Sequence, residues 1–221
     1  TITLTTQTGV DSVKVMGDSN VGFGVTPAAW GASLSAIQVG GTGSLSASTV
    51  ATNGASTYFS QNAYLDNSGV WRYLVTDEAS VMTQNSGTFS FKTKGSGTAA
   101  ASIGFGTDAF FIANNGDVTA SGNVTAYSDA RLKSNVETIP NALEKVCSIR
   151  GVTFDMNDKR GTGVIAQELE EVLPEAVMDS KDGLKSVAYG NVVGLLIQAV
   201  KEQQVTIEKL SKDINKLNKT I

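Results

Sequence analysis

The sequence predicts an α+β protein made of two unlike parts, residues 1–127 and residues 128–221. The first observation is charge: the first part has 4 basic and 7 acidic residues, whereas the shorter second part has 13 and 14. The second is glycine, because 17 of the 23 glycines lie in the first part. The third is hydrophobic periodicity, which is strand-like in the first part and helical in the second. We therefore expect a β-rich segment followed by a mixed α/β domain that ends in a long helix.

Short runs rich in β-branched and aromatic residues predict strands in the first part. Turn sequences such as NG, NSG and SGT separate them. The runs are TITLTT (1–6), TYFSQNAYL (57–65), VWRYLVT (70–76), GTFSFKT (87–93) and DAFFIANNG (108–116). Many of these runs contain few large apolar residues, so one chain has little with which to fill a core, and burial between chains is the physical remedy. Residues 40–56 are low in complexity and fit either a loop or a surface hairpin.

The second part is predicted to contain two short amphipathic helices. Pro140 suits a helix start, and Ile139, Leu143, Val146 and Ile149 then recur on one face, which predicts a helix to about residue 150. We expect Cys147 to be a core residue of this helix. A strand-like GVTFDM (151–156) follows, and GVIAQELEEVLPEAV (163–177) predicts a second helix that Pro174 ends. The charged MDSKDG (178–183) is predicted to be a turn.

From about residue 192 to residue 221 the pattern predicts a coiled coil. Core positions alternate in steps of three and four without a break: Val193, Leu196, Val200, Gln203, Ile207, Leu210, Ile214, Leu217 and Ile221. This stripe spans about 42 Å, which is too long to be covered by its own small domain. The alternative is one long amphipathic helix lying on its own domain. The number of strands stays open, because β-branched residues favour two while a buried glutamine sets register in other oligomers.

Composition excludes several classes of function. A net charge of −4 and a pI near 4.9 argue against nucleic acid as a partner, because phosphate binding needs a basic face. The chain has no histidine and one cysteine, so metal sites built on these residues are excluded, and we expect no metal and no cofactor. No apolar run approaches the roughly 18 residues of a membrane helix, so we expect no membrane insertion. The first residues lack the pattern of a secretory signal.

The stretch YSDARLK (127–133) places a serine and a lysine five positions apart, where the two parts meet. A serine hydroxyl needs a base to become a nucleophile, and lysine is the candidate in a chain without histidine. A lysine amine is normally charged, but burial or a nearby cation favours its neutral form, and Arg131 could supply that cation. The alternative is structural: Ser128 caps a helix, Asp129 faces its positive end, and Arg131 and Lys133 are solvated.

Four motifs in the second part together resemble a known family. They are YSDARLKSNVETI, NALEKVCSIRGVTF, GVIAQELEEVLPEAV and KSVAYGNVVGLLIQAVKEQ, and they run from about residue 126 to the end of the chain. They resemble the C-terminal intramolecular chaperone, a self-cleaving serine peptidase of bacteriophage tail fibres, tailspikes and endosialidases. NAYLDNSGVWRYLVTDEAS and GTFSFKT in the first part also resemble the β-structured fibre segment that often precedes this chaperone.

The resemblance implies a homotrimer whose chaperone parts direct folding of the β-rich fibre and then cut each chain. The scissile bond would join Tyr127 and Ser128, with Ser128 as nucleophile and Lys133 as general base. Residues at other matching positions would orient or stabilise the site, or would be ordinary capping and solvated residues; they are Asp129, Arg131, Asn135, Gln167 and Glu168. The family further implies folding in the host cytoplasm, a place in the virion, and a host cell-surface receptor for the β-rich part.

Family members often carry large modules upstream, whereas only 127 residues precede the motif here, so we expect the chain to be a fragment. A structural trimeric adhesin with a permanent coiled coil and an inert Ser128 is the alternative function. An enzyme acting on host polysaccharide is a third. That chemistry needs a placed pair of carboxylates, and the acids of the first part are scattered. Asp77 and Glu78 are adjacent, but neighbours in a strand point to opposite faces.

Overall fold

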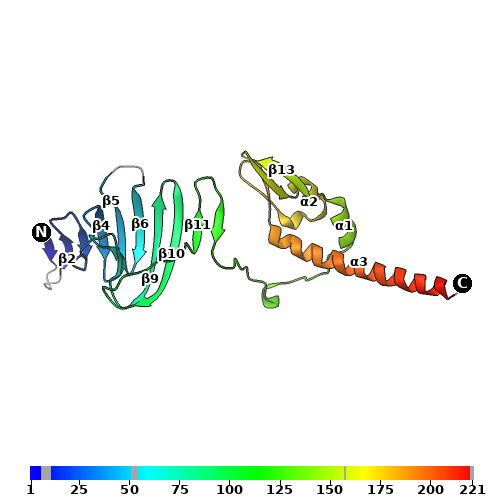
Figure 1. Cartoon of the computed structure of the whole chain (residues 1–221), viewed down its shortest axis with the longest axis horizontal. Coiled ribbons are helices and arrows are strands. Elements are labelled where there is room, and N and C mark those ends of the chain that lie inside the picture. Colours follow the sequence, from blue (N-terminus) through cyan, green and yellow to red (C-terminus); the bar gives the residue numbers. More distant parts are fainter. Residues whose placement is uncertain (6–10, 51–53, 157, 220–221) are drawn as a thin grey trace. The chain divides into compact units, whose positions relative to one another are not determined.

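The chain divides into two compact units, Thr1–Tyr127 (unit 1) and Ser128–Ile221 (unit 2). The computed structural model describes residues 1–5, 11–50, 54–156 and 158–219. Within these residues the regular structure of unit 1 is β, and the α-helices lie in unit 2 together with short strands (Figure 1). The predicted α+β class is therefore confirmed.

Unit 1 is built on one ten-stranded sheet. Its strands in spatial order are β1 (Ile2–Thr5), β2 (Asp11–Val15), β3 (Val21–Phe23), β4 (Leu34–Val39), β5 (Gly43–Ser48), β6 (Ser56–Gln61), β9 (Asp77–Asn85), β10 (Thr88–Gly97), β11 (Phe110–Ile112) and β12 (Val118–Ala120). Strands β3 and β4 pair in parallel, and the other neighbouring pairs are antiparallel. The separate hairpin of β7 (Ala63–Leu65) and β8 (Trp71–Tyr73) interrupts the meander between β6 and β9. Spatial order therefore follows chain order along the whole sheet (Figure 1).

The predicted strands are present, with one break that the pattern did not show. The run 57–65 is divided at Asn62, which has a left-handed backbone (φ 54°) and separates β6 from β7. Within the low-complexity segment 40–56, β5 pairs antiparallel with β4, so the hairpin interpretation holds for its described residues. Thr6 of the first predicted run and residues 51–53 lie outside the described residues.

One face of the sheet is covered by the chain itself. Trp30 precedes β4 and packs with Leu34 and Ala36 of that strand, against Tyr64 of the β7–β8 hairpin. A second cluster joins the hairpin to β9 and to a later loop through Ala63, Tyr73, Ala79 and Ile103. The ring of Tyr73 lies so close to Gly97 that a side chain there would clash with it. The hairpin is therefore a lid on one face of the sheet.

Asn62 holds the base of this lid by hydrogen bonds. Its side chain is fully buried, and its amide nitrogen donates to the carbonyl oxygens of Val75 (3.1 Å) and Glu78 (2.8 Å). Its side-chain oxygen accepts from the backbone N–H of Val75 at 2.7 Å. A buried amide is tolerated when its donors and acceptor are satisfied in this way. Asn62 therefore joins the start of the hairpin to the entry of β9.

The described residues of unit 2 form three α-helices, two small hairpins and two 3-10 turns. The elements are η1 (Ala130–Leu132), α1 (Ala142–Ser148), β13 (Val152–Met156), β14 (Lys159–Gly163), α2 (Ala166–Val172), η2 (Pro174–Ala176), β15 (Val177–Asp179), β16 (Lys185–Val187) and α3 (Tyr189–Asn218). Strands β13 and β14 pair with each other, as do β15 and β16. The two short helices, the strand after α1 and the long last helix are as predicted. Among the described helices, none has both the length and the hydrophobicity of a membrane span.

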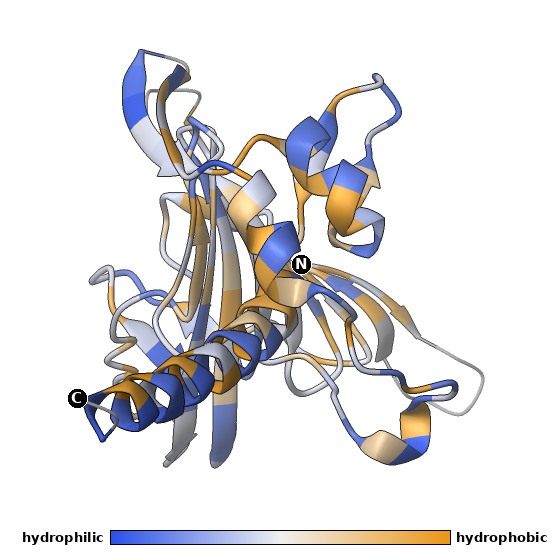
Figure 2. Ribbon diagram, turned by 90° about the vertical axis from the view of Figure 1, so that its right-hand side faces the viewer, coloured by the Kyte–Doolittle hydropathy of each residue, from blue (hydrophilic) through white to orange (hydrophobic). Residues whose placement is uncertain are grey.

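Helix α3 has two apolar faces. Val192, Leu195 and Ala199 are buried in the unit's core with residues of α1, α2 and η2. The predicted heptad positions lie on another face and are about half exposed, from Leu196 at 45% to Leu217 at 65%. Figure 2 shows hydrophobic and hydrophilic residues alternating along this helix. The first turns of α3 do lie on the core of their own unit, as the alternative expects, but through Val192, Leu195 and Ala199 and not through the heptad stripe, which stays exposed in the single chain. Ile221 lies outside the described residues.

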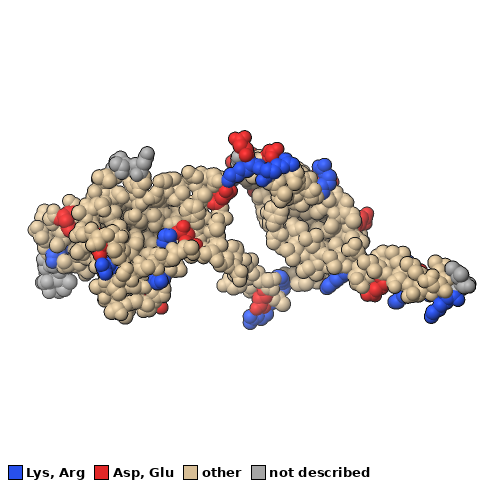
Figure 3. Space-filling model, in the orientation of Figure 1, with Lys and Arg blue, Asp and Glu red and all other residues tan. Residues whose placement is uncertain are grey.

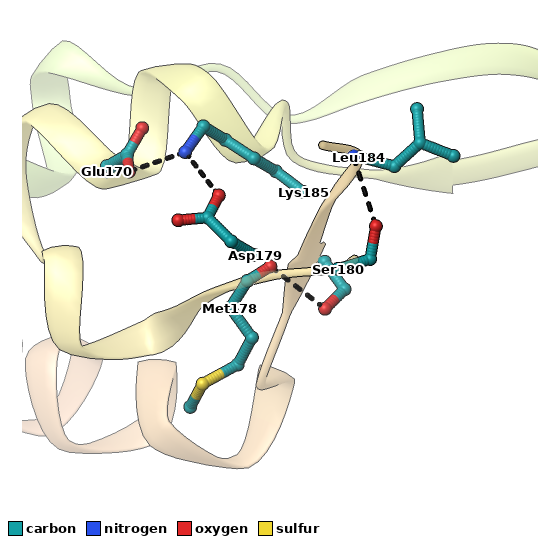
Figure 4. A network of polar contacts seen from close by, with 7 residues as sticks. Glu170, Met178, Asp179, Ser180, Leu184 and Lys185 are labelled. Carbon is teal, nitrogen blue, oxygen red and sulfur yellow. Dashed lines mark hydrogen bonds and ion pairs between the residues drawn. The ribbon is translucent and has the colours of Figure 1, made fainter. Parts of the chain in front are cut away.

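Three carboxylates and a lysine join the elements of unit 2. Glu202 of α3 accepts hydrogen bonds from the backbone N–H groups of Leu143 (2.9 Å) and Ala142 (3.1 Å) at the start of α1. These bonds hold the pKa of Glu202 below its usual value, the bond from Leu143 being the largest cause. Lys185 of β16 contacts Asp179 (2.7 Å) and Glu170 of α2 (2.8 Å), as Figure 4 shows.

Two predictions about unit 2 are wrong in part. MDSKDG is not a turn throughout, because Met178 and Asp179 belong to β15 and the turn begins at Ser180. Cys147 is exposed and not a core residue. The preceding residue, Val146, packs against the core. One step along an α-helix rotates the side chain by about 100°, so Cys147 turns away from the face that the core occupies.

Replacing Asn62 with alanine should destabilise unit 1 by roughly 2–4 kcal/mol, since partly buried backbone groups of Val75 and Glu78 would lose their hydrogen-bond partners. Asn62→Gly is the matched variant: it removes the same bonds but accommodates the left-handed backbone. Urea unfolding followed by β-sheet circular dichroism measures both. If the glycine variant were as stable as the wild type, backbone strain and not hydrogen bonding would explain the loss.

Unit 2 should lose stability in acid through Glu202. The pKa of this carboxyl is lowered in the folded state, so its contribution is present above its unfolded pKa of about 4.3 and is lost as pH falls through the folded value. Glu202→Gln should therefore shrink the drop in melting temperature between pH 7 and pH 3. The control is Glu208→Gln on the same helix, where the carboxylate accepts from Gln204. Equal shrinkage in both variants would contradict the assignment.

Candidate functional site

The junction of the two units is fully accessible. The boundary falls between Tyr127 and Ser128, and every residue from 121 to 138 is exposed, with Tyr127 at 96%. From residue 122 to residue 138 the backbone has no sheet partner among the described residues, whereas the N–H of Ser121 donates to the carbonyl oxygen of Ala109 at 3.1 Å. A peptide bond in such a segment can be approached from several sides, and it is free of the ladder bonds that would hold a strand in place.

A single 3-10 turn separates Ser128 from Lys133. Its residues are Ala130–Leu132, and Asp129 is the capping residue, accepting from the N–H of Arg131 at 2.9 Å. The N–H of Lys133 closes the turn on the carbonyl of Ala130 at 3.1 Å. The structural alternative made Ser128 the capping residue, whereas the cap is the next residue, Asp129. The hydroxyl of Ser128 is not used for capping.

The turn brings the serine and the lysine together. The Nζ of Lys133 donates to the Oγ of Ser128 at 2.8 Å. This is the distance expected when a base or an acid shares a proton with a hydroxyl. Both side chains are exposed in the single chain. A charged ammonium can only donate to the hydroxyl, whereas a neutral amine can accept the proton of the hydroxyl. The geometry therefore suits general-base chemistry, which requires the neutral form of the amine.

Arg131 is paired with Asp129 and not with the serine and lysine. Its Nη2 lies 2.6 Å from Oδ2 of Asp129, and its Nε donates to Oδ1 at 3.0 Å. This hydrogen-bonded pair lowers the pKa of Asp129 and raises that of Arg131. The guanidinium of Arg131 pairs with the carboxylate of Asp129. The negative charge of Asp129 therefore offsets the positive charge that Arg131 was expected to place near Lys133. Together the two residues brace the turn.

The remaining candidate residues lie apart from this pair. Asn135 is exposed and has a left-handed backbone (φ 51°). Gln167 is exposed in α2, and the neighbouring Glu168 accepts from Nε of Arg150 at 3.0 Å, which lowers the pKa of Glu168. Within the described part of the chain, no hydrogen bond or ion pair joins these three residues to Ser128 or Lys133. Any role for them at the serine therefore requires a rearrangement or a neighbouring chain.

Sequence reasoning missed Arg150 and Glu202. Arg150 follows α1 and pairs with Glu168 across 18 positions of sequence, and Glu202 caps α1 across about 60. Neither has a local signal, since an arginine after a helix and a glutamate on a coiled-coil helix both read as solvated surface. Among the described residues, no group of three or more acidic or cysteine side chains is placed to hold a metal ion.

A peptidase family model described as chaperone of endosialidase matches residues 128–178. The matched segment begins at Ser128 and contains the turn, α1, the first hairpin, α2 and η2. Its first residue is therefore the serine that Lys133 contacts.

Curated relatives are long tail fibre proteins named Gp37. The chain is 34% identical over 120 positions to that of Enterobacteria phage K3 (47% of this chain, 10% of the relative) and 39% identical over 114 positions to that of phage Ox2 (46% and 44%). The protein of phage M1 is 41% identical over 101 positions (40% of each chain). The chain thus spans less than half the length of each of these relatives.

Among solved structures, the carboxy-terminal domain of the bacteriophage T5 L-shaped tail fibre with its intramolecular chaperone domain is similar over 75% of this chain and 55% of that one. Its sequence identity is 11% and its TM-score is 0.30. The family match lies within unit 2 and covers the first three of the four motifs from Ser128 onward, whereas the fourth motif, residues 185–203, lies beyond it. The resemblance of this chain's C-terminal unit to the intramolecular chaperone of endosialidases is therefore confirmed.

Proposed function

We propose that this chain is the C-terminal region of a phage tail fibre or tailspike and that unit 2 is a self-releasing trimerisation chaperone. Unit 2 assembles three copies, allows unit 1 to fold in register, and then cuts its own chain between Tyr127 and Ser128. Unit 1 remains in the virion as a β-structured shaft or tip that meets a host cell-surface receptor. The observation that carries this proposal is the 2.8 Å contact between Lys133 Nζ and Ser128 Oγ, in a segment that matches the chaperone family.

The proposed reaction is an N-to-O acyl shift followed by hydrolysis. Lys133, as a neutral amine, takes the hydroxyl proton of Ser128, and Oγ attacks the carbonyl carbon of Tyr127. The C–N bond breaks as the new C–O ester bond forms, and the lysine returns the proton to the departing nitrogen. Water then hydrolyses the ester, which leaves a carboxylate on Tyr127 and an amino group on Ser128. The nucleophile becomes the first residue of the released unit.

Assembly supplies what a single chain lacks. Lys133 is exposed in the monomer, and removal of a lysine from water favours its neutral form. Neighbouring copies that pack over the junction would provide that burial, and they could also bring Asn135, Gln167 and Glu168 to the pair. Cleavage would then report correct assembly, because a chain without partners would leave the lysine in water.

The exposed stripe of α3 supports association between copies. Its positions recur with heptad spacing and are about half exposed in the single chain, although most carry apolar side chains. Such a stripe is covered when like helices pack as a coiled coil. A bundle that forms from local contacts assembles faster than a large sheet with distant strand pairings. After cleavage, unit 2 can no longer direct the refolding of unit 1. The lifetime of folded unit 1 is then set by its unfolding rate.

Replacing either member of the pair should abolish the cut. Wild type is expected to give two fragments, residues 1–127 and 128–221, whereas Ser128→Ala should migrate as one band near 23.0 kDa. Lys133→Arg should slow cutting by roughly 100-fold or more, because a guanidinium stays charged and cannot act as base. Denaturing gels and intact mass spectrometry measure both.

The control for this pair is Ser134→Ala, which changes an exposed hydroxyl beside Lys133. It should cut like wild type. Undiminished cutting in Ser128→Ala would overturn the mechanism, and an uncut wild type would favour a permanent trimeric adhesin with an inert Ser128.

Cutting should also depend on the exposed stripe of α3. Leu210→Glu places a charge in the stripe while keeping a helix-forming residue, and Leu210→Pro breaks the helix. Both should prevent association and cutting, as should strong dilution of the wild type before assembly. Lys209→Glu is the matched control, since it changes charge at the neighbouring position outside the stripe. Sedimentation measures mass and a gel measures cutting; cleavage by a monomeric Leu210 variant at the wild-type rate would refute the dependence.

A further inference from the structure

The sheet of unit 1 ends in an unpaired edge next to the junction. Strand β12 is the last strand of the sheet, and it pairs with β11 on one side only. In an antiparallel pair, successive residues turn their backbone N–H and C=O groups alternately toward the partner and away from it. Asp117 and Ser121 make backbone hydrogen bonds to the residues that flank β11. By this alternation, Val118 and Ala120 turn their backbone groups toward the unpaired edge.

This edge lacks the usual protection of an edge strand. Exposed edges are normally blunted by charged side chains, by proline or by a covering segment, because they otherwise pair with further strands. Residues 118–128 contain no charged residue and no proline. Figure 3 likewise shows few charged side chains on the visible surface of the chain that leads to the junction. The edge of β12 is therefore open to one more strand.

Residues 123–126, which we call the free segment, have the sequence of a strand. β12 reads Val-Thr-Ala, and the same three residues recur at the end of the free segment. Valine and threonine are β-branched and favour strands. The free segment has no sheet partner among the described residues, and its Val124 is 84% exposed (Figure 1). A strand-like segment thus lies unpaired directly after an unpaired edge.

A two-residue turn would bring the free segment onto this edge. Ser121 and Gly122 separate it from β12, and the same dipeptide forms such a turn elsewhere in the sheet. Ser86 and Gly87 join β9 to β10, and the residues that flank them are directly paired. Both have a positive φ (48° and 77°), as two-residue hairpin turns of type I′ require. Neither Ser121 nor Gly122 has a positive φ in the structure, so the chain leaves the sheet there.

The register that this turn would impose matches the unpaired edge. A two-residue loop pairs the residues on either side of it by hydrogen bonds, which here are Ala120 and Asn123. The next hydrogen-bonded pair is then Val118 and Thr125. Val118 and Ala120 are the residues whose backbone groups face the edge. A shift of one residue would instead oppose backbone groups that already bond toward β11.

We infer that the free segment is an eleventh strand of the sheet, which folds back on β12 once the chain is cut after Tyr127. Hydrogen bonds at two residue pairs are set against the entropy of ordering four residues, and these contributions are similar in size. A restraint at one end of the segment is therefore sufficient to keep it open. In the proposed trimer the coiled coil holds Ser128 of each copy until the cut. The coupling of pairing to the cut rests on the proposed function.

Pairing would also separate the products of the cut. The new carboxylate on Tyr127 follows directly on the last residue of the free segment, so it would stay beside the sheet. The new amino group on Ser128 stays with unit 2. The edge of β12 is covered in the same step. Pairing would thus complete the sheet and withdraw one new chain end from the other.

A pair of thiols tests this inference in the full-length chain. In the inferred register Thr119 and Val124 lie opposite each other without hydrogen bonds between them, with Cα atoms about 4.5 Å apart, which suits a disulfide. The paired variant is Thr119→Cys with Val124→Cys, in a Cys147→Ser background that removes the exposed native thiol. The control variant is Thr119→Cys with Thr125→Cys, which turns the second thiol to the other face. Mass spectrometry follows disulfide formation during mild oxidation.

After the cut, the paired variant should form its disulfide at least about tenfold faster than the control variant, because only its two sulfur atoms come within bonding distance. With Ser128→Ala, which keeps the chain whole, the two rates should be similar. Equal rates after the cut would overturn the inference. Equally fast formation in the whole chain would overturn the coupling to the cut. A disulfide between copies would also overturn the inference, since it would assign the free segment to the edge of a neighbouring chain.

Gly122→Val tests the turn itself. A side chain added at Gly122 meets no atom within 4 Å, and its φ is not positive, so the open form tolerates the substitution. In the paired form valine would need a positive φ, which is an outlier for a β-branched residue. The paired variant with Gly122→Val should therefore oxidise at the rate of the control variant, whereas Ser121→Asn, which suits the turn, should keep the fast rate. A fast rate with Gly122→Val would overturn the inference.

Failure of the proposed function is read separately, from the wild-type gel. If the wild type is never cut, limited trypsin digestion of the Ser128→Ala chain after Arg131 or Lys133, which are both exposed, supplies a cut in the junction. Fast disulfide formation in that digested chain would support the pairing and remove only the self-cleavage. A chain that cuts itself, but whose paired variant oxidises like the control variant, would keep the cleavage and reject the eleventh strand.

Discussion

Both units bury one apolar face within the chain and leave another uncovered, and this shared condition underlies the properties of the molecule. In unit 1 the loops and the β7–β8 hairpin cover one side of the sheet, while Phe59, Phe91 and Phe110 remain exposed on the other. In unit 2 the core takes Val192, Leu195 and Ala199 from α3 and leaves the heptad stripe in water. Apolar surface of this extent is stable in water only when it is buried. In the proposed function, association between copies would bury such apolar surface.

In the proposed function, the junction couples this need for burial to self-cleavage. Lys133 and Ser128 are in hydrogen-bond contact without help from other parts of the chain, because a single 3-10 turn sets their spacing. The Asp129–Arg131 pair braces that turn and leaves the lysine to the serine. In the single chain both side chains are exposed to solvent. In the proposed assembly, neighbouring copies would bury the lysine. Self-cleavage would then follow assembly of the copies.

Local patterns predicted the elements well where a single periodicity governs a segment. The helices near Pro140 and before Pro174, the strand after α1 and the long last helix all follow from apolar spacing. Predictions were poorer where a side chain forms hydrogen bonds with residues that are distant in the sequence. Asn62 divides a run that reads as one strand because its amide is claimed by Val75 and Glu78, more than ten residues later. Cys147 was expected in the core because a free cysteine is usually buried, but it is not one of the positions that recur on the apolar face of its helix, and it is exposed.

The candidate pair could be identified from sequence because its two members are five residues apart and flank one turn. The other candidate residues could not be assigned in the same way. Glu168 is held by Arg150 through a contact between distant positions, and Gln167 and Asn135 point into solvent in the single chain. Spacing along the chain does not reveal which of them approach the serine, since that depends on packing between elements and between copies.

The sequence by itself determined the two-part division, the periodicity of each part, the seven-residue repeat of the last helix and the adjacency of Ser128 and Lys133. These are short-range properties, since propensity, turn chemistry and residue spacing act over a few positions. Only the tertiary structure decided which face of the sheet is covered, which face of α3 enters the core and which carboxylate Arg131 binds. Those outcomes depend on strand register and on contacts between distant residues, where the free energy of burial selects one arrangement among many that local preferences allow.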